Sequence, residues 1–197
     1  MFPRTGDRVV AIGTEIINDN ISEVAAIEIV NYQTTGLQYQ SYLKPFNALT
    51  ENERKNILPT IRPRTIKTAL ESFLKFVGDS IIIAHNSASS IKTLNAQLKK
   101  HLPGCELISL KRAYCTRQML EEVYSESKSL DEACKKFGIE TLERVNHGAY
   151  VDSKKCAELY IALHNVNLAR IKGKSLKDKL LSRKQYLITL GEKNNTL

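Results

Sequence analysis

The stretches Arg8-Val-Val-Ala-Ile-Gly-Thr14 and Ile81-Ile-Ile-Ala84 decide the fold. Both are short, apolar and rich in β-branched residues, which is typical of strands covered on both faces of a sheet. Between them, residues 21–30 and 37–44 alternate in part between apolar and polar side chains, and Thr34-Thr-Gly36 lies in the gap. These two runs predict a hairpin that turns at residues 34–36.

The rest of the chain predicts helices, because apolar residues recur every three or four positions. Ser129 and Glu132 form a capping box, and Gly138 ends that helix. A short strand is expected at residues 105–109, before a helix around residues 113–123. This order predicts a mixed α/β domain with three antiparallel strands first and helices packed on the sheet. The other predicted helical faces are Ile66, Leu70, Phe73 and Val77 before Gly78; Ile91, Leu94 and Leu98; and Cys156, Leu159, Tyr160 and Leu163.

Positive charge is concentrated at the C-terminal end of the chain. The protein has 197 residues and a net charge of +8, and residues 165–197 hold eight Lys or Arg against two acids. We therefore expect a nearly neutral domain in residues 1–168 and a basic amphipathic tail helix in residues 169–197. Ser175 and Asp178 predict that this helix restarts after Gly173.

Composition excludes several classes of protein. No run reaches the roughly 18 apolar residues that a membrane span needs, so we expect no membrane partner. The N-terminal residues lack the apolar core of a signal peptide. Four cysteines without a CxxC pair predict buried thiols in a reducing compartment, and hence a cytoplasmic protein.

Polar residues follow two of the predicted strands and precede a predicted helix. Glu15 ends the first strand, and His85-Asn86 follows residues 81–84. His147 and Asp152 lie around the start of the helix that carries Cys156. Each has an ordinary alternative: a solvated acid, a helix cap, or a carboxylate beside a helix dipole. Separately, none of them identifies a function.

Together, these segments resemble the DnaQ-like 3′–5′ exonucleases of the DEDDh type, the proofreading family that includes the epsilon subunit of bacterial DNA polymerase III. The resemblance implies an RNase H-like fold in which four carboxylates hold two metal ions and a histidine activates water. The segments that carry it are Val9-Val-Ala-Ile-Gly-Thr-Glu15, Ile21-Ser-Glu-Val-Ala-Ala-Ile-Glu-Ile-Val-Asn31, Tyr42-Leu-Lys-Pro45, Ile81-Ile-Ile-Ala-His-Asn86, Ser129-Leu-Asp-Glu-Ala-Cys134 and His147-Gly-Ala-Tyr-Val-Asp152.

The sequence departs from the family pattern at two metal ligands. Gly13 stands where the first-strand Asp is expected, and Ser90 stands where the second Asp is expected, after Ser89 in place of Phe. Glu15, His147 and Asp152 are retained. The family's Val-His-Gly segment is not recognisable in residues 49–61. Because two of the four carboxylates are missing, we expect a degenerate site with lost or strongly impaired nuclease activity.

Two functions compete on this basis. The leading hypothesis is a pseudoenzyme of DNA replication that binds nucleic acid or associates with a DNA polymerase. The alternative is a residual metal-dependent 3′–5′ exonuclease acting on single-stranded ends. It would use one Mg²⁺ or Mn²⁺ held weakly by Glu15 and Asp152, with His147 as the base, since Mg²⁺ can be bound by one or two carboxylates together with substrate phosphates.

The expected partner is a single-stranded nucleic-acid end, with DNA favoured over RNA by the resemblance. In the epsilon family a C-terminal extension contacts the polymerase subunit, so the tail could bind a polymerase, although it could equally dock on its own domain. The candidate nucleic-acid contacts are Thr14, His85 and Asn86 in the domain and Lys172, Lys174, Lys177, Arg183 and Lys184 in the tail.

Overall fold

The computed structural model describes residues 3–17, 20–43, 64–125, 127–139 and 148–194, and of residues 174–194 only the backbone. Five strands form one mixed sheet in the order β3-β2-β1-β4-β5. Antiparallel pairing joins β3 to β2 and β2 to β1, whereas β1, β4 and β5 run parallel. This confirms the predicted mixed α/β sheet. The strands are β1 (Arg8–Ile17), β2 (Asn20–Val30), β3 (Gln33–Tyr42), β4 (Ile81–Ala84) and β5 (Ala113–Cys115).

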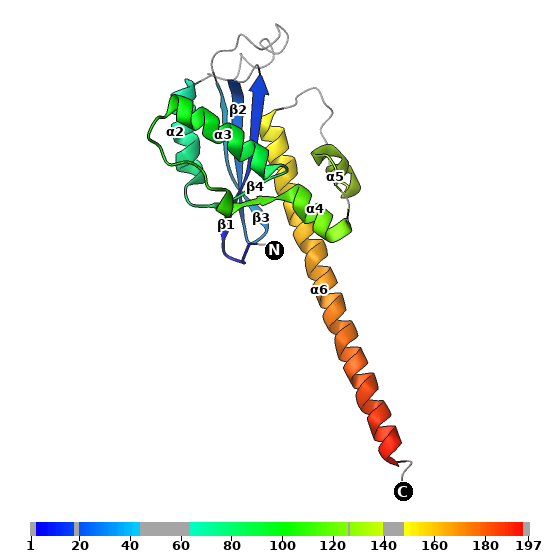
Figure 1. Ribbon diagram of the computed structural model, residues 1–197. Coiled ribbons are helices and arrows are strands. Elements are labelled where there is room, and N and C mark those ends of the chain that lie inside the picture. Colours follow the sequence, from blue (N-terminus) through cyan, green and yellow to red (C-terminus); the bar gives the residue numbers. More distant parts are fainter. Residues whose placement is uncertain (1–2, 18–19, 44–63, 126, 140–147, 195–197) are drawn as a thin grey trace.

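Helices cover both faces of this sheet (Figure 1). On one face, α2 (Ile66–Val77) and α3 (Ser87–His101) pack against the alternate residues Val10 and Ile12 of β1. On the other face, Val9 and Ala11 belong to a second apolar cluster with the remaining helices. Strand periodicity thus divides the core into two layers. The remaining helices are α4 (Thr116–Tyr124), α5 (Leu130–Lys136) and α6 (Ala149–Asn194), and a short 3₁₀ helix, η2 (Leu110–Arg112), precedes β5.

The hairpin turns earlier than the sequence pattern predicts. Asn31 and Tyr32, with φ of 52° and 60°, form the two-residue connection between β2 and β3. Two consecutive positive φ values match the right-handed twist of paired strands, which explains the short turn. Gly36, with φ of 86°, lies instead inside β3, opposite a register shift between Ile27 and Ile29. The prediction of a turn at residues 34–36 was therefore wrong.

The fifth strand lies later than predicted. Residues 113–115 pair with β4, and α4 follows them directly. Residues 105–109 form no strand. Instead, the side chain of Asn95 satisfies both backbone hydrogen-bonding groups of Ile108. The Asn95 amide donates to the Ile108 carbonyl and accepts from its N–H, both at 2.9 Å. This pairing replaces the hydrogen bonds that a neighbouring strand would supply.

Helix α6 continues without a break from Ala149 to Asn194 and extends far beyond the domain (Figure 1). The predicted restart after Gly173 is therefore not observed. Glycine inside a helix costs only about 0.5–1 kcal/mol relative to alanine, too little to interrupt it. Ser175 and Asp178 lie within this helix and not at a helix start; their side chains fall outside the described residues. None of the helices in the described ranges is apolar over enough length to cross a membrane.

Other predicted elements are confirmed. Helix α2 buries Leu70, Phe73 and Val77 and ends at Gly78. The capping box is present, since Ser129 accepts from the Glu132 N–H while the Glu132 carboxylate accepts from the Ser129 N–H. The four cysteines are free thiols. Three of them, Cys115, Cys134 and Cys156, are buried as predicted, whereas Cys105 is only half-buried. Burial raises the pKa of Cys134 to about 11 and that of Cys156 to about 12.

The first turn of α6 lies unusually close to the sheet. A Cβ atom added to Gly13 of β1 would lie 1.9 Å from the Ala149 carbonyl oxygen. A Cβ added to Gly148 would lie 2.6 Å from Glu23 Oε2 of β2. Gly13 pairs with Ala25, so two small residues lie side by side under the start of the helix. The absence of side-chain atoms at Gly13 and Gly148 is what permits this approach.

We predict that Gly13→Ala destabilises the protein by about 1–3 kcal/mol, because the new methyl group overlaps a backbone carbonyl that cannot move without the helix. Urea denaturation measures this change in the free energy of unfolding.

Gly173→Ala is the matched control for Gly13→Ala. Apart from its chain neighbours and the backbone of its own helix, no described atom lies within 4 Å of the added Cβ at Gly173, which is exposed on α6. Alanine should stabilise that position by about 0.5–1 kcal/mol. Equal stability of native protein and Gly13→Ala would show that α6 does not pack on β1 in this way.

Candidate functional site

Two acidic residues lie side by side on the sheet beside the start of α6. Glu15 of β1 pairs directly with Glu23 of β2. Glu15 is half-buried, whereas Glu23 is only 3% exposed. Residues directly opposite each other in an antiparallel pair point to the same face of the sheet. Glu15 therefore lies on the face that α6 covers, next to a carboxylate that sequence reasoning did not assign to the site.

The Glu23 carboxylate binds the N-terminus of α6. Its Oε2 accepts a hydrogen bond of 2.7 Å from the Ala149 N–H, and its Oε1 accepts one of 3.4 Å from the Tyr150 N–H. The Gln40 side chain of β3 donates to Oε1 at 2.7 Å. The first N–H groups of a helix have no partner within the helix, and they favour a negative charge. Glu23 thus fastens the helix to the sheet.

Burial dominates the electrostatics around Glu23. It raises the pKa of the carboxyl group, while the bonds from Gln40, Ala149 and Tyr150 lower it, and the net shift is upward. The negative charge of Asp152 adds to the upward shift. Burial and the neighbouring Glu23 also raise the pKa of Tyr42 to about 12. The structure therefore brings Asp152 into electrostatic range of Glu23, one helical turn into α6.

His85, directly after β4, has both ring nitrogens engaged. Nδ1 lies 3.0 Å from Thr116 Oγ1, and Nε2 lies 2.8 Å from the Lys128 carbonyl oxygen. Burial lowers the pKa of the imidazole, the Lys128 carbonyl raises it and the charge of Arg117 lowers it, with a net downward shift. His85 thus links β4 to the start of α4 and to the segment before α5.

The other predicted site residues in the domain differ in accessibility. Thr14 and Ser90 are half-buried, and Ser89 is exposed in the first turn of α3. Asn86 is exposed at the N-cap of α3, but its side chain makes no capping hydrogen bond. Asp152 is half-buried in α6.

The structure describes the remaining predicted site residues only in part. His147 falls outside the described residues. Lys172 is exposed on α6. Only the backbone of α6 is described at the other predicted tail contacts, Lys174, Lys177, Arg183 and Lys184.

The described residues do not fit a centre with two metal ions. Such a centre holds both ions between carboxylates that are free to coordinate them. Here the Ala149 carbonyl occupies the space beside Gly13, and the Glu23 oxygens accept hydrogen bonds from α6. Within the described ranges, no three His, Cys, Asp or Glu side chains gather as metal ligands would.

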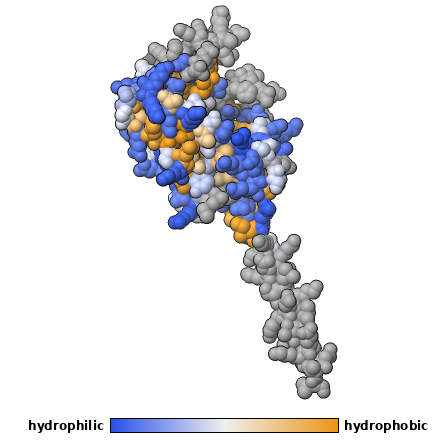
Figure 2. All heavy atoms as spheres, in the orientation of Figure 1, coloured by the Kyte–Doolittle hydropathy of each residue, from blue (hydrophilic) through white to orange (hydrophobic). Residues whose placement is uncertain are grey.

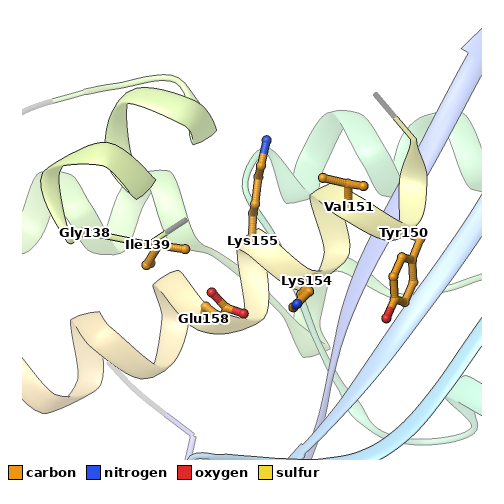
Figure 3. A pocket seen from close by; sticks show the side chains of 7 residues that line it. All are labelled: Gly138, Ile139, Tyr150, Val151, Lys154, Lys155 and Glu158. Carbon is orange, nitrogen blue, oxygen red and sulfur yellow. The ribbon is translucent and has the colours of Figure 1, made fainter. Parts of the chain in front are cut away.

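A separate pocket of about 400 Å³ lies between α6 and the residues that follow α5 (Figure 3). None of the predicted site residues lines it. Two of its polar groups are engaged: Lys155 forms an ion pair of 2.7 Å with Asp131, and the Tyr150 hydroxyl donates to Gln38 at 2.9 Å. Hence it does not coincide with the candidate site. The lining residues are Gly138, Ile139, Tyr150, Val151, Lys154, Lys155 and Glu158.

Glu23 should make the stability of the protein depend on pH. Because its pKa is raised in the folded state, its contribution is fully present below the unfolded pKa, near 4.5, and is lost as the pH rises through the folded pKa. The difference in unfolding free energy between native protein and Glu23→Gln should therefore fall as the pH rises from about 4 to about 7. Urea denaturation across this range measures the difference.

Glu28, in the same strand, provides a control of opposite sign. Burial raises the pKa of its carboxyl group, but hydrogen bonds from Thr35 and Arg8 outweigh this and lower it overall. The difference between native protein and Glu28→Gln should grow as the pH rises through the acidic range. A Glu23→Gln difference that also grows with pH would contradict the assigned environment of Glu23.

Comparison with known sequences identifies relatives of this chain. The sequence model of a family described as Exonuclease matches residues 9–160. DNA polymerase III subunit epsilon of Rickettsia felis is 32% identical over 168 residues, which cover 82% of this chain and 68% of the relative. The same subunit of Escherichia coli is 27% identical over 164 residues, covering 77% of this chain and 65% of the relative. The chain thus spans about two thirds of these relatives.

Solved structures agree on the fold. A 3′-exonuclease from a structure of 3′-end recognition of histone mRNA stem-loop aligns with a TM-score of 0.60 and 17% identity, over 81% of this chain and 63% of its own. A catalytic unit with protease and nuclease domains from Neurospora crassa aligns with a TM-score of 0.59 and 15% identity, over 92% of this chain and 30% of its own. The sheet order and the matched residues lead to one conclusion: this chain belongs to the exonuclease family that includes DNA polymerase III subunit epsilon.

Proposed function

We propose that the protein is an exonuclease-fold module with lost or strongly impaired nuclease activity, which binds nucleic acid or associates with a DNA polymerase. One observation carries the proposal. The Ala149 carbonyl lies where a side chain at residue 13 would project, so the packing of α6 leaves no room for an Asp at this position. This packing supports the proposal that residue 13 has no role as a metal ligand.

Two further contacts support a structural use of the site. Glu23 binds the start of α6, and His85 binds Thr116 and the Lys128 carbonyl. Both side chains hold elements together beside the retained acids Glu15 and Asp152. A polar cluster committed to internal hydrogen bonds is less available to substrate, because withdrawing a partner leaves buried groups unsatisfied.

The relatives and the tail support the proposed partners. The curated relatives are subunits of DNA polymerase III. Residues 165–197 carry eight basic and two acidic side chains, and α6 projects beyond the domain (Figure 1). Apolar surface is visible where α6 leaves the domain (Figure 2), and Leu168 and Ile171 are 39% and 57% exposed on this helix. Basic and apolar side chains on one projecting helix suit a partner with an acidic, apolar groove.

In a nuclease assay, we predict no processive 3′–5′ digestion of single-stranded DNA or RNA by the native protein with Mg²⁺ or Mn²⁺. The Escherichia coli epsilon subunit serves as positive control. Gly13→Asp with Ser90→Asp restores both missing carboxylates, yet we expect it to stay inactive and to unfold more easily, because the Ala149 carbonyl blocks residue 13.

If the native protein digests the substrate, and Glu15→Ala or Asp152→Ala abolishes this digestion, the proposal is overturned in favour of the residual exonuclease. Glu71→Ala is the matched control, since Glu71 is an exposed acid of α2.

Truncation after Gly173 tests the role of the tail. The removed residues include six Lys or Arg, Lys174, Lys177, Lys179, Arg183, Lys184 and Lys193, against two acids. If the tail contacts phosphates, truncation should weaken binding of a single-stranded oligonucleotide. It should also reduce the slope of the logarithm of the binding constant against the logarithm of salt concentration by about 0.7 per lost contact. Fluorescence anisotropy at several salt concentrations measures both. An unchanged slope would show that the domain, and not the tail, makes the contacts with nucleic acid.

A further inference from the structure

Three lysines line one open hollow on the outer side of α5. Lys128, Lys135 and Lys136 border this depression of about 420 Å³, and its described lining includes one acid, Glu132. Lys135 and Lys136 are exposed, and Lys128, just before the helix, is half-buried. This lysine hollow therefore holds three positive charges against one negative charge.

Both acids of α5 are engaged within the protein. Glu132 Oε2 accepts hydrogen bonds from the Ser129 N–H at 2.9 Å and from the Ser129 hydroxyl at 2.6 Å. These bonds lower the pKa of the Glu132 carboxyl group, desolvation raises it and the charge of Lys128 lowers it, with a net downward shift. Asp131 forms an ion pair of 2.7 Å with Lys155 of α6. The charge that this side of α5 presents to an anion is therefore positive overall.

The aromatic ring beside the lysine hollow is already covered. Lys136 Nζ lies 4.2 Å from the centroid of the Tyr124 ring, and the Phe137 ring packs against Tyr124 at a centroid distance of 5.8 Å. Aromatic side chains bind unpaired bases by offering a ring face. Because Lys136 lies over this ring, the hollow offers positive charge without a stacking platform. Such a surface suits phosphates, which carry no sequence information.

The lysine hollow lies between the candidate site and the tail. The Lys128 carbonyl oxygen lies 2.8 Å from Nε2 of His85, at the end of β4. On the other side, Arg170 of α6 donates at 2.8 Å to the Val123 carbonyl, one residue before the ring that Lys136 contacts. Basic side chains thus extend from the site, over α5, to the part of α6 that leaves the domain (Figure 1).

We propose that the lysine hollow binds the phosphate backbone of a single-stranded nucleic acid that extends from the candidate site toward the tail. The inference rests on the nucleic-acid binding proposed above, and it adds the surface on which the domain makes contact. Glu121 and Glu122, exposed on α4, repel phosphates, so the strand follows α5. Each lysine that neutralises a phosphate releases counterions, which makes the binding strongly dependent on salt.

Fluorescence anisotropy of the full chain with oligo-dT and oligo-rU at several salt concentrations tests this contact. Lys135→Gln with Lys136→Gln should weaken binding of both oligonucleotides by about tenfold near 0.1 M salt and reduce the salt slope by about 1.4, for two lost contacts. Lys67→Gln with Lys75→Gln is the matched control. It removes the same charge from two exposed lysines of α2, on the opposite face of the sheet, and should bind like the native chain.

The outcomes separate this inference from the proposed function. Equal affinity and slope in the two double variants would overturn the inference and leave the proposed function standing. A native chain that binds neither oligonucleotide would overturn both the inference and the nucleic-acid branch of the proposed function. Lys135→Arg with Lys136→Arg keeps both charges and should restore native binding; a loss as large as that of the Gln variant would also count against phosphate contacts.

Lysine acetylation tests the same surface on the native chain, even if the Gln variant does not fold. Bound oligo-dT should slow the acetylation of Lys135 and Lys136 severalfold and leave Lys67 and Lys75 unchanged, because the strand covers α5 and not α2. Mass spectrometry of proteolytic peptides measures the modification of each lysine. Protection confined to the lysines of the tail, or equal protection of α2 and α5, would contradict the proposed contact.

Discussion

The contact between the Ala149 carbonyl and Gly13 is the constraint on which the rest of the site depends. It allows the first turn of α6 to lie directly on β1, and Glu23 secures it there through the helix N–H groups. Removing a side chain from residue 13 therefore has two consequences. It lets a helix occupy the space that a side chain would need, and, in the proposed correspondence with the family pattern, it deletes a metal ligand.

Local sequence patterns were sufficient to predict most of the fold. The confirmed elements depend on contacts between residues that are close in sequence. They are the apolar runs of β1 and β4, the buried face of α2 and the capping box of α5. The failures have tertiary causes. The strand at residues 113–115 depends on pairing with β4, and the turn at Asn31 depends on strand twist, not on the nearest glycine. Gly173 did not break α6, because one glycine costs a helix little.

The candidate site was predictable in part. The resemblance placed Gly13, Glu15, Ser90 and Asp152 at family positions, but whether these positions serve in this chain remains a prediction. Glu23 lies in the strand after that of Glu15 and at none of the metal-ligand positions of the family pattern, so the sequence did not assign it to the site. Its strand pairs with β1 so that Glu23 faces Glu15, and two of its three hydrogen-bond donors belong to α6, some 126 residues away in sequence. An acid among the apolar residues of this strand was the available signal, but Glu28 shares it.

A crystal structure of the protein grown with Mn²⁺ tests the central claim most directly, since the anomalous signal of manganese locates every bound ion. We expect the Ala149 carbonyl in contact with Gly13, and no manganese peak between Glu15 and Asp152. A pair of manganese ions about 3.5–4 Å apart at these residues, with α6 withdrawn from Gly13, would contradict the closed site.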